Sequence, residues 1–205
     1  MCILFTHVDP NPNEGDYRLI VATNRDEFYR RPALDARRCD EAELFVIGGK
    51  DMEPGREGGM WFGFSTKEMK DGKRKKHCIA TLLNITGEKA VHADVTVELS
   101  KDEANTFHHS NTPTIDSVYS GKQTLAFGNS PTYSPLRKVM EGRNKFEEII
   151  NRDLHNDELV EELLKLLKDK SSHLPDPELE KRAPVDYPLL SSIFVKIEQE
   201  GYGTR

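Results

Sequence analysis

The hydrophobic pattern of the chain changes its period between the two halves, and this change limits the folds that the sequence can adopt. Up to residue 84, the apolar residues fall in short runs that are separated by turn-rich or charged stretches. Runs of this kind predict β-strands joined by turns. We expect strands at Cys2–Val8, Tyr17–Thr23, Leu44–Ile47, Met60–Phe64 and Cys78–Asn84.

The C-terminal half places its apolar residues at helical spacing. The pattern predicts one amphipathic helix over Leu136–Ile150 and a second over Leu159–Leu167, for which Asn156 is the candidate N-cap. Proline removes a backbone donor and restricts the residue before it, so we expect the second helix to stop at Leu174–Pro177. Ser191–Ile197 then predicts a late strand.

The order of these elements indicates the fold class. Strands, a helical layer and a return to the sheet are typical of an α+β fold. A length of 205 residues suits one domain, and we assign residues 1–205 to it. The polar stretch Ser100–Ser117 is the only candidate interruption.

The charge and the composition exclude several classes of partner. The chain carries 29 Lys and Arg against 35 Asp and Glu, a formal net charge of −6, so we expect no nucleic-acid partner. The apolar runs are far shorter than the ~20 residues of a membrane span. The first twenty residues lack the apolar core of a secretory signal, and the three cysteines are widely spaced, as reduced thiols are. We therefore expect a cytoplasmic protein without a membrane span.

Cys2 is the first candidate for chemistry. If Met1 is removed, the thiol and a free α-amine belong to one residue, and an α-amine has a reference pKa of about 7.7–8.0. An amine of this kind can accept the proton of its own thiol, which is the device of an N-terminal nucleophile. The alternative is that Cys2 is a small apolar residue at the start of a strand.

Polar residues follow the second predicted strand. Asn24-Arg25-Asp26-Glu27 lies where a strand ends, a common place for site residues, and Arg30 lies in the turn that follows. The alternative is a solvated turn closed by weak ion pairs. Asn84 and Asn129 are neutral amide donors that suit an oxyanion hole, although asparagines of this kind also cap turns.

Neither a metal site nor a phosphate loop is indicated. The seven histidines form no metal-binding motif, and we expect no metal and no required cofactor. The glycine pairs Gly48–Gly49 and Gly58–Gly59 lack phosphate-loop spacing and predict turns at strand ends, with Trp61 in the core.

Several segments together resemble one family. They are Met1–Ile3, Ala22–Pro32, Gly48–Asp51, Gly59–Gly63, Gly128–Ser130, Leu174–Pro177 and Gly201–Arg205. Their order and content are similar to those of the transport and Golgi organisation protein 2 family, also called the NRDE family. The resemblance runs from one end of the chain to the other, and Ala22–Pro32 is its most specific part.

The resemblance implies an αββα sandwich of the N-terminal-nucleophile hydrolase type, with Cys2 at the head of a strand. By analogy with cysteine amide hydrolases of that fold, Cys2 attacks a carbonyl, its amine moves the proton, and Asn84 or Asn129 stabilises the oxyanion. Asn24 and Asp26 complete the expected catalytic set. The expected ligand-binding residues are Arg25, Glu27, Arg30 and Arg205, of which Arg25 or Arg205 holds an acidic group.

The chain departs from the family pattern in two places. The interval from Asn84 to Gly128 is short and lacks the usual central Tyr-Asn-Gly-Phe-Asn block, and the chain stops at Arg205, where relatives continue into closing strands. We therefore expect an incomplete sandwich that lacks a central and a C-terminal strand and has unpaired sheet edges.

The resemblance implies a role in Golgi organisation, secretion, mitochondrial and lipid metabolism or haem movement, with association with mitochondria or the Golgi. Our first hypothesis is a carrier that takes haem as a transported ligand. The second is an amidase or acyl thioesterase that uses Cys2. The third is a scaffold for secretory or mitochondrial proteins that docks them on the Leu159–Leu167 helix. The haem hypothesis has as its candidate contacts Arg25, Arg30, Arg31 and the pair His108–His109.

Overall fold

The computed structural model describes residues 2–39, 45–68, 75–87, 92–100, 103–111 and 114–204. The helices are α1 (Arg137–Ile150), α2 (Asn156–Leu167) and α3 (Pro177–Arg182). The strands are β1 (Ile3–Val8), β2 (Leu19–Asn24), β3 (Asp26–Phe28), β4 (Ala33–Cys39), β5 (Phe45–Asp51), β6 (Phe62–Glu68), β7 (Lys75–Asn84), β8 (His92–Leu99), β9 (Ala104–Asn111), β10 (Thr114–Ser120), β11 (Gln123–Phe127), β12 (Lys196–Ile197) and β13 (Tyr202–Thr204).

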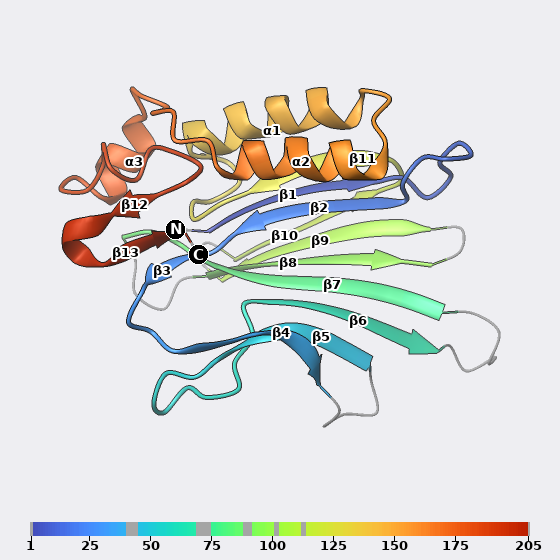
Figure 1. Ribbon diagram of the computed structural model, residues 1–205, viewed down its shortest axis with the longest axis horizontal. Coiled ribbons are helices and arrows are strands. Elements are labelled where there is room, and N and C mark those ends of the chain that lie inside the picture. Colours follow the sequence, from blue (N-terminus) through green and yellow to red (C-terminus); the bar gives the residue numbers. More distant parts are fainter. Residues whose placement is uncertain are drawn as a thin grey trace.

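Two helices and two sheets form three layers (Figure 1). Helices α1 and α2 cover one face of the antiparallel sheet β11-β1-β2, and the other face of this sheet packs on a seven-stranded antiparallel sheet of order β10-β9-β8-β7-β6-β5-β4. A third sheet, β12-β13-β3, lies at one end of the molecule. The α+β fold is confirmed. The described residues place no helical layer on the outer face of the seven-stranded sheet, so they contain three of the four layers of the expected αββα sandwich.

Strand β1 begins with the apolar run Ile3–Phe5, and the structure shows why this run does not alternate with polar residues. Ile3 and Phe5 pack toward the helices, whereas Leu4 and Val8 pack toward the seven-stranded sheet. A strand that is buried on both faces has a continuous apolar run instead of an alternating one. β1 is therefore the central strand of the molecule, and Cys2 directly precedes it.

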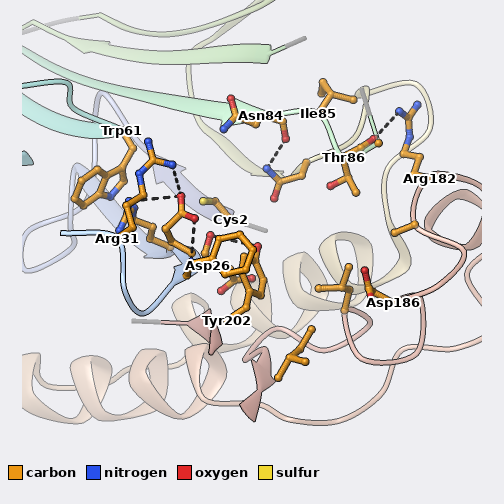
Figure 2. A pocket seen from close by; sticks show the side chains of 18 of the residues that line it. Cys2, Asp26, Arg31, Trp61, Asn84, Ile85, Thr86, Arg182, Asp186 and Tyr202 are labelled. Atoms are coloured by element: carbon orange, nitrogen blue, oxygen red, sulfur yellow. Dashed lines mark hydrogen bonds and ion pairs between the residues drawn. The ribbon is translucent and has the colours of Figure 1, made fainter. Parts of the chain in front are cut away.

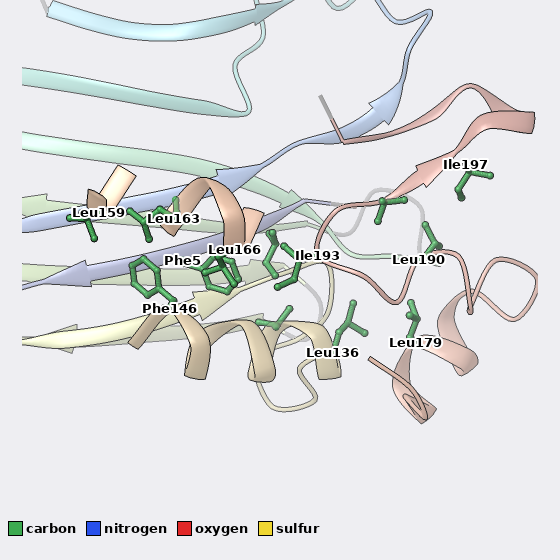
Figure 3. Close-up of a cluster of buried hydrophobic side chains, with 14 residues drawn as sticks. Phe5, Leu136, Phe146, Leu159, Leu163, Leu166, Leu179, Leu190, Ile193 and Ile197 are labelled. Carbon is green, nitrogen blue, oxygen red and sulfur yellow. The ribbon is translucent and has the colours of Figure 1, made fainter. Parts of the chain in front are cut away.

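Helix α1 packs closely on strand β1 of the sheet β11-β1-β2, and this contact forms part of the hydrophobic core shown in Figure 3. Phe5 of β1 and Phe146 of α1 stack with their ring centroids 5.6 Å apart. A Cβ atom on Gly142 would lie 2.6 Å from Cζ of Phe5, which is closer than real atoms approach. Glycine at position 142 therefore allows α1 to lie directly on β1.

The prediction of a loop after the second strand is wrong. Asn24 is the last residue of β2, and Asp26–Phe28 forms β3, which pairs with β13 in the register Asp26 to Thr204. The two partners lie 178 residues apart in the sequence. No local pattern could indicate this pairing.

The predicted interruption at Ser100–Ser117 is also wrong. This stretch contains β9 and the beginning of β10, which pair with each other and extend the seven-stranded sheet beyond β8. In β9 the inward side chains are Ala104, Thr106, His108 and Ser110, which are all buried. The stretch was not predicted as a strand because the inward face of β9 is largely polar, whereas the pattern for a strand requires apolar residues on that face.

The second helix is confirmed, and it ends at Leu167, the last residue of its predicted apolar pattern. Its N-cap is His155 rather than Asn156, and the helix ends before Leu174–Pro177, which we expected to stop it. Those later residues begin α3 instead, because the Asp176 side chain accepts a hydrogen bond from the backbone N–H of Leu179 at 3.0 Å.

Two further expectations are met only in part. Of the predicted strand Ser191–Ile197, only Lys196–Ile197 is a strand. On α2 the residues Leu159, Leu163 and Leu166 are buried in the core, and Leu164 is exposed. The proposed docking face is therefore not a cluster of exposed leucines.

No helix among the described residues has both the length and the apolar composition that crossing a bilayer requires.

Asp169 fastens the end of α2 to α1. Its carboxylate accepts hydrogen bonds from Lys145 Nζ at 2.6 Å and from the Ser171 backbone N–H at 2.7 Å. Burial alone would raise the pKa of Asp169, but these hydrogen bonds outweigh burial and lower the pKa to about 2. Asp169 is therefore ionised down to strongly acidic pH.

We expect Asp169→Asn to lower the free energy of unfolding by about 2 kcal/mol at pH 7. A depressed pKa gives stability that is complete above the unfolded value and is lost as pH falls through the folded value, so the difference should shrink by about half at pH 3. Urea unfolding at both pH values measures it, with the exposed Asp153→Asn as the control. A cost that stays constant from pH 7 to pH 3 would contradict the role of the charge.

Candidate functional site

A cavity of about 770 Å³ lies at the end of the molecule where the three sheets meet. Figure 2 shows the Cys2 side chain between two walls, with Trp61 and Arg31 on one side and Thr86 and Arg182 on the other. The walls come from β3, from the ends of β5 and β7, from the segment after α3 and from β13. Five segments that are distant in the sequence thus converge on Cys2.

The Cys2 thiol is held in a site that favours its protonated form. Burial raises the pKa of this thiol, and so does the charge of Asp26. The charge of the amino terminus, a backbone hydrogen bond from Asp26 and the charge of Arg25 offset part of the effect. A buried thiol with a raised pKa needs a proton acceptor before it can act as a nucleophile. Chemistry at Cys2 therefore requires a nearby base or a positive charge.

Asp26 is fixed beside Cys2 by the pairing of β3 with β13. Its side chain is buried, with 6% of the residue exposed, and it accepts a hydrogen bond from Thr204 Oγ1 at 2.5 Å. The Tyr202 hydroxyl donates to the backbone oxygen of Asp26 at 3.3 Å, and burial raises the pKa of Tyr202. The strand pairing thus fixes both the backbone and the carboxylate of Asp26.

Arg25 supplies a positive charge to the cavity wall. Its guanidinium carbon lies 3.9 Å from the ring centroid of Trp61, and its nearest carboxylate is Glu27 at 3.7 Å. Glu27 bonds more closely to Arg31 at 2.8 Å, and Arg31 also bonds to Asp51 at 2.5 Å. Burial lowers the pKa of Arg25, but a guanidinium stays charged in proteins. Arg25 can therefore bind an anionic group of a ligand.

Asn84 and Asn129 lie on the cavity wall and are bonded to each other. The Asn129 side-chain nitrogen donates to the backbone oxygen of Asn84 at 2.5 Å, which fixes the orientation of the amide. The amide oxygen is buried and has no hydrogen-bond partner among the described residues, whereas the amide nitrogen has a second N–H. Asn129 can thus offer a ligand one donor.

Comparison with known proteins decides the family. The sequence model of the family described as Transport and Golgi organisation 2 matches residues 1–103 and 93–205, which together cover the whole chain. The chain belongs to the Transport and Golgi organisation 2 family.

Named members of this family are similar over the full length of the chain. Transport and Golgi organization protein 2 of Drosophila melanogaster is 34% identical over 252 residues, which cover 100% of this chain and 85% of the relative. The homologue of Bos taurus is 31% identical and that of Homo sapiens 30% identical, each over 239 residues that cover 100% of this chain and 86% of the relative.

These alignments are longer than the chain of 205 residues, so the relatives contain positions that this chain lacks. The two family matches overlap at residues 93–103, within the interval from Asn84 to Gly128 that we expected to be short relative to the family pattern.

The Transport and Golgi organisation 2 motif from Asn24 to Glu27 divides between the cavity and the core. Arg25, Asp26 and Glu27 line the cavity as expected. Asn24, which we expected in the catalytic set, does not line the cavity. Its side-chain nitrogen donates to the backbone oxygens of Leu167 at 2.8 Å and Ile193 at 3.1 Å, so it joins α2 to the segment before β12.

Several other expected ligand contacts lie away from the cavity. Arg30 is exposed and packs over the Phe28 ring, and it does not line the cavity. His108 is buried and stacked on Phe127 at 5.5 Å, and His109 bonds to Asp116 on the sheet. The histidines whose side chains are described, which are His7, His77, His108, His109, His155 and His173, do not line the cavity. Arg205 lies outside the described residues.

Three residues in or near the site were not predicted from the sequence. Trp61, which we expected in the core, lines the cavity and supports Arg25. Arg182 lines the opposite wall, where it bonds to Glu178 at 2.5 Å. Lys138 is buried in the first turn of α1 near Cys2 and Asp26, although a lysine in a helix is normally a surface residue.

Proposed function

We propose that this chain is a cysteine-dependent acyl hydrolase of the N-terminal-nucleophile type, acting on an amide or a thioester. The observation that supports this proposal is the position of Cys2, directly before the central strand β1 and on the wall of a cavity that also contains Asp26, Arg25, Asn84 and Asn129. A nucleophile, an anion-binding group and amide donors around one space are the parts that acyl transfer requires.

The mechanism begins with removal of Met1, which frees the α-amine of Cys2. This amine accepts the thiol proton, and the sulfur forms a bond to the carbonyl carbon of the substrate. The remaining N–H of Asn129 and the side-chain amide of Asn84 stabilise the oxyanion. The leaving amine or thiolate departs with the proton from the ammonium group, and water then hydrolyses the acyl-cysteine and restores the thiol.

The layering of the fold adds support by analogy. Two stacked antiparallel sheets with a helical layer on one face agree with three of the four layers of an N-terminal-nucleophile hydrolase. Fold alone does not determine activity, so the proposal depends on the chemistry at Cys2.

Intact mass and thiol labelling test the proposal. We expect the purified chain to lack Met1 and a limiting amount of an alkylating electrophile at pH 7 to label Cys2 before Cys39 and Cys78. These two cysteines are internal controls, since neither lines the cavity. Retention of Met1, or equal labelling of the three cysteines, would contradict the proposal.

Haem transport is a second candidate function for the same cavity. Met60, Trp61 and Leu82 give it an apolar wall, and Arg25 can pair with a propionate. Among the residues that line the cavity, Cys2, Met60 and Tyr202 have side chains of the kinds that can serve as an axial haem ligand. Titration with haem should then shift the Soret band at micromolar concentration, and Arg25→Met should weaken binding. An unshifted band would exclude this function.

The names of the relatives refer to transport and Golgi organisation. We propose a cytoplasmic location with Golgi or mitochondrial association for this chain, which fractionation of cells expressing a tagged chain would test.

A further inference from the structure

Arg25 lies on the cavity wall and has no carboxylate within hydrogen-bond distance in the part of the chain that the structure describes. Its side chain is 12% exposed, and the Glu27 carboxylate that it approaches lies 3.7 Å away, between Nη2 and Oε2. Its guanidinium carbon stacks 3.9 Å from the ring centroid of Trp61. A guanidinium has five N–H donors, and a largely buried charge is unfavourable without partners. Arg25 can therefore donate to a ligand in the cavity.

Glu27 does not come closer to Arg25 because both of its carboxylate oxygens are bonded elsewhere. Oε1 accepts the backbone N–H of Phe28 at 2.9 Å, and Oε2 accepts Nη1 of Arg31 at 2.8 Å. The oxygen that lies 3.7 Å from Arg25 is thus the one that Arg31 already binds. Glu27 compensates the charge of Arg31 more closely than that of Arg25.

Asp51 holds Arg31 in this position. Nε and Nη2 of Arg31 donate to the two carboxylate oxygens of Asp51 at 3.2 and 2.5 Å, the paired geometry that arginine forms with carboxylates. Asp51 is the last residue of β5, and its Oδ1 also accepts the backbone N–H of Glu53 at 3.1 Å. The turn after β5 therefore fixes Asp51, Asp51 fixes Arg31, and Arg31 fixes Glu27.

We propose that Arg31 and Asp51 hold Glu27 away from Arg25, and that Arg25 thereby selects substrates with one negative charge outside the bond that is cleaved. Arg31 and Asp51 are positioning residues, and Arg25 is the residue that determines specificity. This inference rests on the proposed acyl hydrolase function and adds its substrate class.

The chemistry of the cavity wall indicates a carboxylate as the charged group. A carboxylate has two oxygens and one charge, which match the fork of a single guanidinium. A phosphate monoester carries a charge of about −1.5 to −2 at pH 7, which exceeds what one guanidinium compensates. Met60, Trp61 and Leu82 also line the cavity and suit an apolar acyl group. The expected substrates are acyl compounds that bear a carboxylate, such as N-acyl amino acids.

The fluorescence of Trp61 tests this inference without any need for hydrolysis. Trp61 is the only tryptophan of the chain, and Arg25 stacks on it. The probes are N-octanoylglycine and the neutral N-octanoylglycinamide, which differ in charge and hardly in size. We expect the unmodified chain to bind the acid roughly tenfold more tightly than the amide. Arg37→Gln changes an exposed arginine outside the cavity and, as the control, should keep this ratio.

Arg31→Gln should remove most of the preference for the acid, because Glu27 can then pair with Arg25 and compete with the carboxylate of the ligand. The double variant Arg31→Gln with Glu27→Gln separates this cause from a merely structural role of Arg31. It removes the competing carboxylate as well, so the preference should return to within about threefold of the original ratio.

A third variant needs no change at Arg31. Glu27→Gln removes the negative charge that lies 3.7 Å from Arg25 and leaves the bonds between Arg31 and Asp51 in place. We expect it to bind N-octanoylglycine about threefold more tightly and the amide with unchanged affinity. This result keeps the inference testable if the Arg31 variants fail to fold.

The outcomes separate the inference from the proposed function. Equal affinities for the acid and the amide in the unmodified chain, or no binding of the acid at millimolar concentration, would overturn the inference. A folded double variant without the preference, or an unchanged affinity for the acid in Glu27→Gln, would also overturn it. Tighter binding of N-octanoyl-O-phosphoethanolamine than of N-octanoylglycine would overturn the choice of a carboxylate. A chain that prefers the acid but cleaves no acyl amide or thioester would instead contradict the proposed function.

Discussion

Replacing Cys2 by serine should lower the rate of acyl-thioester hydrolysis roughly a thousandfold or more at pH 7.5. A serine hydroxyl is not ionised near neutral pH, and Cys2 is the nucleophile of the proposed mechanism. The hydrolysis of a panel of short acyl thioesters and amides, measured under steady-state conditions, gives the ratio. The free energy of unfolding should change by less than about 1 kcal/mol, since the substitution keeps the size of the side chain.

Cys78→Ser is the matched control for this prediction. Cys78 lies in β7, outside the cavity, and its replacement should keep the full rate. A Cys2→Ser variant with normal activity would place the nucleophile elsewhere. Absence of hydrolysis in the unmodified chain, together with a haem-dependent Soret shift, would favour the carrier function instead.

The elements that could be predicted are those whose side-chain pattern is local. β1 and β2 are short apolar runs between turns, and α1 and α2 repeat their apolar residues every three or four positions. β3 could not be predicted, because two acidic residues and a phenylalanine form a strand here only when β13 is beside them.

The difference between local sequence patterns and contacts from distant segments also applies to the residues of the site. The family resemblance identified Cys2 and Asp26, which line the cavity. It could not indicate which members of a continuous motif face the cavity, because this depends on segments distant in the sequence, such as the ends of α2 and of the segment before β12 that bind Asn24. Arg25 therefore faces the ligand space, and Asn24 faces the core.

Lys138 and Trp61 show a different limit. The sequence pattern places each residue correctly in its helix or turn. Whether the side chain of Lys138 or Trp61 is exposed depends on segments that are distant in the sequence and pack on it. Trp61 lies on a wall because Arg25 stacks on it, and Lys138 is buried because the Ser192 segment covers it. Neither contact has a signature in the residues that flank it.

Asn24→Asp should lower the free energy of unfolding by about 4 kcal/mol at pH 7. Only 7% of Asn24 is exposed, and its amide nitrogen donates to the backbone oxygens of Leu167 and Ile193. A carboxylate has the same shape but only accepts hydrogen bonds, so it would face two carbonyl oxygens without a donor between them. Urea unfolding followed by circular dichroism measures the loss.

The pH dependence identifies the cause of this loss. Burial beside two carbonyls raises the pKa of the introduced carboxyl, and the protonated form regains one O–H donor, so the penalty should decrease as pH falls below about 5. Asn105→Asp is the control, because the Asn105 side-chain oxygen already accepts a hydrogen bond from Ser120, and a carboxylate keeps this contact. If folded Asn24→Asp lost Cys2 reactivity with no loss of stability, Asn24 would belong to the catalytic set after all, and the division of the motif between cavity and core would be wrong.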